Sequence, residues 1–203
     1  LLGGDISLLP SYEEAGTVYR DEAGKAVAPL EYFKEEGWNA IRVRLFVEPD
    51  RASAEHKGEG VCQDLDYVMK LGQRIKKAGY QFMLDFHYSD TWADPGKQFM
   101  PYRWKNSGVA SLPDSVYQYT RKSLEVMVKA GACPDLIQVG NEITNGMMWP
   151  AAKVEPLGKD NWDILVKLLE SGAKACREVC PRAKIIIHTE KAGEWDKTKS
   201  YYN

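Results

Sequence analysis

The stretch "KAGYQFMLDFHYSD", residues 77–90, contains one complete junction of the fold. It starts at the end of a helical pattern, turns at Gly79, continues as an apolar run and ends in polar residues. The same order recurs along the chain. Apolar runs rich in β-branched and aromatic residues predict strands at 3–9, 39–47, 80–88, 135–143 and 183–190. The sequence therefore predicts a repeated strand and helix unit.

The segments between these runs have helical patterns, with apolar residues every three or four positions. Each pattern puts one apolar stripe of a helix toward a core. The first stripe is Leu65, Val68, Met69, Gly72 and Ile75. The second stripe is Leu165, Leu168, Leu169, Gly172, Cys176 and Val179.

Residues at the helix ends support the same pattern. We expect N-caps at Asn161 and at the pair Asp114 and Ser115. Gly37, Gly79 and Gly131 stand just before predicted strands, where left-handed C-caps belong.

Alternating strands and helices with mostly apolar strands predict a parallel α/β sheet covered by helices. The alternatives are an open doubly wound sheet and a closed (β/α)8 TIM barrel. No GxGxxG or GxxxxGK[ST] loop follows any predicted strand, which disfavours a nucleotide-binding open sheet. Polar residues instead follow several strands, as at the catalytic face of a barrel, at Glu48, 87–94, 141–145 and 188–190. We therefore predict the barrel.

The length of the chain limits how much of that barrel it can form. The predicted strands begin at residues 3, 39, 80, 135 and 183. One unit thus takes about 45 residues, and eight units would need about 360. We expect residues 1–203 to form the N-terminal part of a single catalytic domain, with the first five βα units. A five-stranded piece has open sheet edges and should not be stable alone.

Composition excludes several classes of partner. The formal net charge is −2, so nucleic acid and anionic membranes are not expected as partners. No apolar stretch reaches the ~18 residues of a membrane span, and the first ten residues lack the pattern of a signal peptide. The four cysteines, at 62, 133, 176 and 180, form no CxxC pair and are interpreted as packing thiols. We expect a soluble mature chain without a cofactor.

The tetrapeptide "GNEI" places Glu142 at the end of a buried strand. A carboxylate in a partly desolvated cleft has a raised pKa and can donate a proton near neutral pH, although a glutamate here could also only cap the loop. Other strand ends and loops supply charged and aromatic groups, which together are typical of a sugar site: Arg42, Arg44, Asp85, His87, His188, Glu190, Trp92, Trp104, Trp149 and Tyr102.

Four segments closely resemble glycoside hydrolase family 53, the endo-β-1,4-galactanases that cut arabinogalactan side chains of pectin. They are "GGDISLLPSYEEAG", "GWNAIRVRLFVEP", "LDFHYSDTWADPGKQ" and "PDLIQVGNEITNGMMWP". The resemblance implies a (β/α)8 barrel and a retaining double displacement. It also implies an acid/base glutamate at the end of strand four and a nucleophile glutamate at the end of strand seven, outside this chain.

Carried over residue by residue, the resemblance makes Glu142 the acid/base and Asn141 the partner of the sugar 2-hydroxyl. Arg42 or Arg44 would keep the nucleophile ionised, and Arg44 is favoured because it lies nearer the strand end. His87 would line the cleft, with Asp85 behind it.

Further substrate contacts are expected from Asp90, Trp92, Asn145 and His188. For Trp149, stacking on a sugar and packing within its loop remain open, while Gly146 and Met147 would shape that loop. "DPG" makes Asp94 a turn residue. Glu190 could touch substrate, form an ion pair with Lys191 or another neighbour, or do neither, but its strand-five position does not match the nucleophile.

The expected partners are β-1,4-galactan and galacto-oligosaccharides, bound by a monomer in an extracellular, surface or periplasmic location. The calcium site that some family members have lies in a late loop beyond this chain, so no metal is expected. Because the nucleophile is absent, a galactan-binding protein without catalysis is the alternative, and a related hydrolase of another β-glycan is a third hypothesis.

Overall fold

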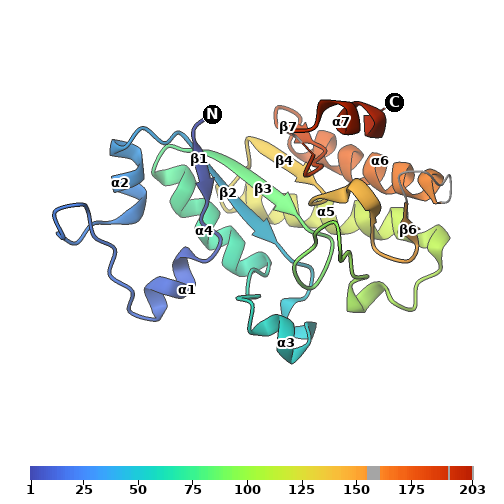
Figure 1. The fold of residues 1–203 in the computed structure, drawn as a ribbon, viewed down its shortest axis with the longest axis horizontal. Helices are drawn as coiled ribbons and strands as arrows, with labels where there is room; N and C mark the ends of the chain where they lie inside the picture. Colours follow the sequence, from blue (N-terminus) through green and yellow to red (C-terminus); the bar gives the residue numbers. More distant parts are fainter. Residues whose placement is uncertain (155–160, 192, 203) are drawn as a thin grey trace.

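The computed structural model describes residues 1–154, 161–191 and 193–202. Five strands form one sheet in the order β1-β2-β3-β4-β7, and every neighbouring pair is parallel (Figure 1). Their bounds are β1 Gly3–Asp5, β2 Ala40–Leu45, β3 Gln81–Phe86, β4 Leu136–Val139 and β7 Lys184–Ile186. The five predicted strands and their parallel arrangement are confirmed.

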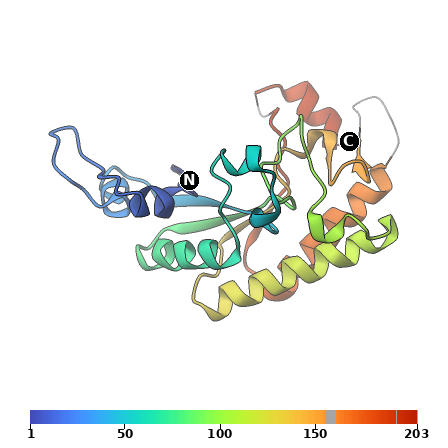
Figure 2. The same cartoon turned by 90° about the horizontal axis from the view of Figure 1, so that it is seen from below.

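Long helices cover one face of this sheet. They are α4 Leu65–Lys77, α5 Leu112–Lys129 and α6 Trp162–Val179, which lie along the same side in Figure 2. The shorter helices are α1 Leu9–Glu14, α2 Pro29–Glu35, α3 Ala54–Lys57 and α7 Trp195–Tyr202. Connections include the short hairpin β5 Gly146–Met147 and β6 Ala152–Lys153, and the 3-10 turns η1 Pro49–Arg51, η2 Tyr102–Trp104, η3 Val109–Ser111 and η4 Ile143–Asn145.

The two faces of β2 explain how the sheet separates core from site. Ile41, Val43 and Leu45 are fully buried, whereas Arg42 and Arg44 lie on the opposite face with partial exposure. Successive residues of a strand point to opposite faces, so the apolar set packs under the helices and the arginines face the inner side. Burial of this apolar set is the main force that holds the helices to the sheet.

The predicted glycine turns are confirmed at the ends of α2, α4 and α5. Gly37, Gly79 and Gly131 all have φ between 75° and 90°. At the end of α5, the Gly131 N–H donates to Val128 O at 3.0 Å and the Ala132 N–H donates to Met127 O at 2.8 Å. This pair of bonds is the Schellman motif, which satisfies the last carbonyls of the helix and turns the chain into the next strand.

Several expected boundaries were wrong. β4 and β7 end at Val139 and Ile186 rather than at 143 and 190, and β4 stops where Gly140 turns the chain with φ 86°. The first strand ends at Asp5, because the Ser7 N–H and hydroxyl both donate to the Asp5 carboxylate and the backbone turns into α1. Helix α5 begins at Leu112 after the N-cap Ser111, so Asp114 and Ser115 lie inside its first turn. Proline is favoured in a first helical turn, and Pro113 accounts for the earlier start.

Asn161 is the N-cap of α6, as predicted, but it does not cap with its side chain. Its Nδ2 donates to Lys153 O at 2.9 Å instead. All four cysteines are free thiols, also as predicted. Within the described ranges, no helix combines the length and the apolar character needed to span a membrane.

Candidate active site

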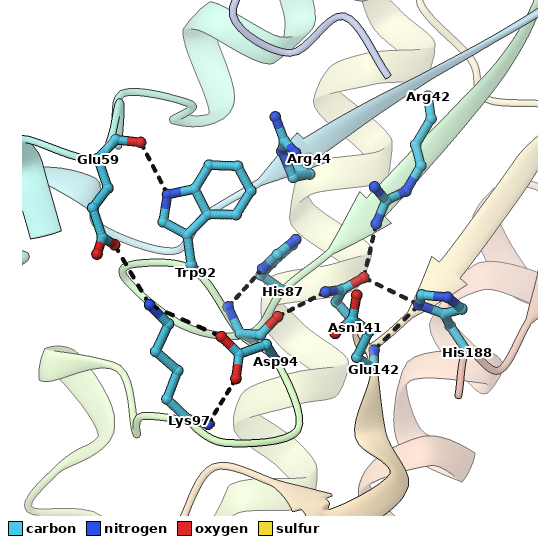
Figure 3. A pocket seen from close by; sticks show the side chains of 11 residues that line it. Arg42, Arg44, Glu59, His87, Trp92, Asp94, Lys97, Asn141, Glu142 and His188 are labelled. Carbon is cyan, nitrogen blue, oxygen red and sulfur yellow. Dashed lines mark hydrogen bonds and ion pairs between the residues drawn. The ribbon is translucent and has the colours of Figure 1, made fainter. Parts of the chain in front are cut away.

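A cavity of about 380 Å³ opens where β2, β3, β4 and β7 end (Figure 3). Its walls bring together seven of the residues predicted for the site, namely Arg42, Arg44, His87, Trp92, Asn141, Glu142 and His188. Four further residues, Glu59, Ala93, Asp94 and Lys97, complete the lining. Carboxyl ends of parallel strands meet at one edge of a sheet, so residues up to 146 positions apart in the sequence become neighbours.

Glu142 follows β4 in a left-handed conformation, with φ 49° and ψ 49°. Its backbone N–H donates to His188 Nδ1 at 3.2 Å, and the next N–H, of Ile143, donates to His188 O at 3.0 Å. Across the described part of the chain, its carboxylate has neither a hydrogen bond nor an ion pair. The backbone of Glu142 is therefore held in place while its acidic group stays available.

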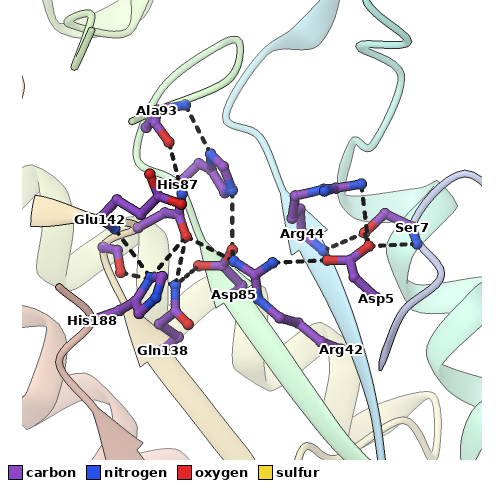
Figure 4. Close-up of polar contacts among 12 residues, drawn as sticks. Asp5, Ser7, Arg42, Arg44, Asp85, His87, Ala93, Gln138, Glu142 and His188 are labelled. Atoms are coloured by element: carbon purple, nitrogen blue, oxygen red, sulfur yellow. Dashed lines mark hydrogen bonds and ion pairs between the residues drawn. The ribbon is translucent and has the colours of Figure 1, made fainter. Parts of the chain in front are cut away.

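Asn141 is the centre of a hydrogen-bond network (Figure 3), and its neighbours Arg42, Ala93, Gln138 and His188 are labelled in Figure 4. Its Oδ1 accepts from Arg42 Nη2 at 2.7 Å and from Gln138 Nε2 at 3.0 Å, while its Nδ2 donates to Ala93 O at 2.7 Å. His188 Nδ1 also lies 3.1 Å from Oδ1. These partners fix which way the amide faces. Contact between Asn141 and a sugar hydroxyl stays a prediction.

Asp85 is fully buried below this network. It accepts hydrogen bonds from Gln138 Nε2 at 2.6 Å and from Arg42 Nη2, and His87 Nε2 lies 3.0 Å from its Oδ2. Burial acts to raise the pKa of Asp85, but His87, Arg42 and His188 outweigh it and lower the pKa below its usual value. Asp85 is thus a buried anion held by the groups that line the cavity.

His87 is oriented by two contacts. The Ala93 N–H donates to His87 Nδ1 at 3.1 Å, so this nitrogen carries no proton and the ring proton of the neutral form lies on Nε2. That nitrogen faces the carboxylate of Asp85. A histidine ring whose tautomer is set in this way presents a fixed edge to the cavity.

The two arginines of β2 have different surroundings. Arg42 contacts Asp5 at 3.0 Å as well as Asp85 and Asn141. Arg44 pairs with Asp5 at 3.1 Å, and its guanidinium lies 4.1 Å from the centroid of the Trp92 ring. Arg42 is therefore the arginine that contacts the residue beside Glu142. That Arg44 would face a nucleophile stays a prediction.

Three predicted substrate contacts lie outside this cavity. Asp90 accepts from the N–H groups of Glu48 and Tyr102, at 2.9 and 2.6 Å, and so ties two loops together. Burial raises the pKa of Asp90. Asn145 donates to Pro95 O at 2.9 Å, and Trp149 lines a second cavity of about 580 Å³ together with Asp90. Their contact with galactose stays a prediction.

Two questions left open by the sequence concern Asp94 and Glu190. The N–H groups of Gly96 and Lys97 donate to Asp94 Oδ1 at 2.7 and 3.1 Å, which confirms the turn. Glu190 accepts from the Thr144 hydroxyl and pairs with Lys191 at 3.1 Å. Burial acts to raise the pKa of Glu190, but these partners outweigh it and lower the pKa. Of the roles left open for Glu190, the structure shows the ion pair with Lys191.

Sequence reasoning missed two buried glutamines that lie behind the residues lining the site. Gln138 joins Asp85 to Asn141, and Gln98 donates to the carbonyl oxygens of Asn141 and Glu142. A signal existed for Gln138, since a polar residue in the otherwise apolar "LIQV" strand needs a buried partner. Gln98 follows a turn and carries no such local signal.

Comparison with known proteins gives one consistent result. The model of glycosyl hydrolase family 53 matches residues 1–203. A curated relative from Neosartorya fischeri, described as a probable arabinogalactan endo-beta-1,4-galactanase A, is 35% identical over 204 residues. That match covers 99% of this chain and 53% of the relative, so the chain spans about half the length of the curated relatives it matches.

Solved structures agree with the family match. The GH53 catalytic domain of Ignisphaera aggregans superposes with a TM-score of 0.85 at 34% identity, over 99% of this chain and 55% of that domain. A structure from a study of two fungal beta-1,4-galactanases gives 0.85 at 33% identity, over 98% and 56%. The five-stranded sheet is accordingly part of a (β/α)8 barrel, as predicted.

Proposed function

The chain belongs to glycosyl hydrolase family 53, and on that premise we propose that the full-length protein hydrolyses β-1,4-galactan within the polymer chain. Family membership and the names of the relatives support this substrate. The observation that carries the proposal is the carboxylate of Glu142 at the end of β4, which has no hydrogen bond or ion pair among the described residues. It stands beside an amide held by hydrogen bonds to three neighbouring groups. A site with one available acid among fixed polar groups is suited to protonating a glycosidic oxygen.

In the proposed mechanism, Glu142 is the general acid that protonates the leaving sugar and then the base that activates water. Asn141 would hold the sugar 2-hydroxyl, and Trp92 and His87 would form the wall against which the ring lies. A retaining double displacement needs a second carboxylate roughly 5–5.5 Å from the first. We propose that strand seven of the complete barrel supplies it.

Other carboxylates in the cavity wall are engaged. Lys97 lies 3.5 Å from Glu59 and 3.9 Å from Asp94, and Asp94 also accepts backbone N–H groups. These contacts support Glu142 as the acid among the lining residues. Because galactan is an external polymer, we further propose that the protein works outside the cytoplasm or at the cell surface. We also propose that it works as a monomer.

The test is Glu142→Gln in the full-length protein, with turnover measured as new reducing ends from galactan. General acid–base catalysis contributes typically 10²–10⁴-fold, so turnover should fall by about that factor while affinity for galacto-oligosaccharides is nearly unchanged. Glu125→Gln is the control, because Glu125 pairs with Arg121 on the exposed face of α5 and does not line the cavity. Near-normal turnover of Glu142→Gln would exclude the assigned acid.

The same assay separates the other hypotheses. Binding of galacto-oligosaccharides without any new reducing ends from the unchanged protein would establish a galactan-binding protein without catalysis. Faster hydrolysis of mannan or cellulose than of galactan would instead indicate a related hydrolase with another β-glycan as substrate.

A further inference from the structure

We propose that Gln98 is a positioning residue for Glu142, and that its side-chain amide holds the acid in its working orientation. The inference rests on the proposed role of Glu142. Gln98 follows the turn at residues 94–97, and only 1% of it is exposed. Among the described residues, its side chain has hydrogen bonds to backbone carbonyls and to no side chain of the cavity wall, so its influence on the site runs through the backbone.

The contacts of the Gln98 amide converge on one short segment. Nε2 donates to Asn141 O at 2.8 Å, to Glu142 O at 3.3 Å and to Asp94 O at 3.2 Å. Three carbonyl oxygens around one nitrogen also identify which end of the amide is the NH₂ group, because a rotated amide would place an oxygen against three oxygens. The backbone of Gln98 is anchored separately, since its O accepts from the Trp149 N–H at 2.7 Å.

The carbonyls of Asn141 and Glu142 flank the Cα atom of Glu142. Their relative direction is set by φ and ψ of that residue, which are both 49°. This left-handed conformation is unfavourable for a residue with a side chain, and it brings two carbonyl dipoles toward the same side. An NH₂ group with two protons between these oxygens offsets their repulsion, so the Gln98 amide favours the observed conformation over the alternatives.

His188 holds the opposite side of the same segment. It accepts the Glu142 N–H through Nδ1 and the Ile143 N–H through its carbonyl oxygen. Gln98 thus binds the carbonyls and His188 binds the N–H groups, and the carboxylate itself is left without a partner in the described ranges. A backbone clamped on both sides explains how an acid with no side-chain partner can have a defined position.

The experiment uses Gln98→Glu and Gln98→Met in the full-length protein. Glu keeps the shape but replaces the donor by an oxygen that faces three carbonyls, and Met keeps the approximate length without any donor. Gln63→Met is the control, because Gln63 is equally buried and its Nε2 also donates to a backbone carbonyl, but to Gly60 O and not to a carbonyl of Asn141 or Glu142. Thermal unfolding of each variant verifies that it is folded at the assay temperature.

The discriminating measurement compares two substrates. On galactan, whose leaving group needs protonation, both Gln98 variants should lose about 10²-fold in kcat, as expected for a misplaced catalytic group, with KM changed less than about threefold. On a dinitrophenyl β-galactobioside, whose leaving group needs no acid, the loss in the bond-breaking step should be below about threefold.

Each outcome bears on a different statement. Equal losses on both substrates, or no loss on galactan, would overturn the positioning role of Gln98, because a general structural defect slows both reactions alike. Hydrolysis of neither substrate by the unchanged protein would instead overturn the proposed function itself. If Gln98→Glu does not fold, Gln98→Met alone decides the comparison.

Discussion

At the residue scale, the side chains around Asn141 are more fully engaged than the proposed acid beside it. Asn141 uses both its amide oxygen and its amide nitrogen within the protein, and Asp85 is enclosed by Arg42, Gln138 and His87. Fixed dipoles of this kind need no reorganisation when charge develops on a substrate. The polar network would therefore be a rigid support for the proton transfer proposed for Glu142.

The pKa of His188 predicts how stability depends on pH. Burial is the largest cause that lowers this pKa below the ordinary value, although Asp85 acts to raise it. Between the lowered folded pKa and about 6.5, the unfolded chain binds a proton that the folded chain does not. This contribution to stability is complete above about pH 6.5 and is lost as pH falls through the folded pKa.

We therefore expect the free energy of unfolding, measured by urea titration of the full-length protein, to rise with pH up to about 6.5. His188→Gln should reduce that slope. His56→Gln on α3 is the control, because His56 lies outside the network. An identical slope for the unchanged protein and His188→Gln would contradict the shift.

The sequence predicts the members of this site better than their connections. Glu142 and His87 could be recognised because a polar residue at the end of an apolar strand is conspicuous. Gln98 could not, since its partners lie 43 and 44 positions further along the chain and meet it only after the loop folds back. Asp90 was expected to contact the sugar and Trp149 was left open between sugar stacking and loop packing; their loops carry both to the second cavity.

At the element scale, the repeated unit depends on the glycine turn that follows each of three helices. Gly131 has φ +75°, and a Cβ atom built on it would meet nothing within 4 Å. Substitution there changes the backbone energy without a steric clash. The position is therefore suited to measuring the turn itself.

We predict that Gly131→Ala lowers the free energy of unfolding by about 1–2 kcal/mol, the cost of a left-handed residue with a Cβ atom. Gly108→Ala is the matched control, because Gly108 has φ −63° and equally open surroundings. It should be neutral or stabilise by about 0.4–1 kcal/mol. Equal effects of the two substitutions in urea titrations would show that the turn does not depend on glycine.

The same elements show where local patterns lose their predictive power. Strand positions and glycine turns follow from periodicity and backbone sterics, so they could be predicted. The end of β1 depends on a side-chain contact between Ser7 and Asp5, and the start of α5 depends on a proline in its first turn. Such single contacts move a boundary by several residues without changing the hydrophobic pattern.

At the scale of the whole molecule, the five-stranded sheet has two edge strands, β1 and β7, each with an edge that is unpaired in the described part of the chain. Within the described ranges, β1 pairs only with β2 and β7 pairs only with β4. A cavity of about 380 Å³ beside β1 is lined by residues of β1 and β2, including Arg42, and by Leu1 and Met83. Leu1 and Leu2 are 75% and 55% exposed next to it. Unpaired edges of this kind promote association between chains.

We predict that a protein consisting of residues 1–203 alone elutes from gel filtration as aggregates and binds the dye ANS. A protein that adds the remaining strands of the barrel should elute as a monomer with little dye binding, because those strands cover both edges. A monomeric segment 1–203 that unfolds cooperatively would contradict this expectation and show that the five units are sufficient for stability.

The three glycine turns also bear on how such proteins diversify. Gly37, Gly79 and Gly131 all precede a strand, whereas the lining residues His87, Glu142 and His188 follow one, so the turns lie at the opposite end of the sheet from the cavity. Each of the three glycine turns has a similar left-handed φ, and none of these glycines lines the cavity. Genetic recombination at two of these glycines would therefore exchange one strand, the loop that follows it and the next helix between relatives, and would keep the glycine turns unchanged.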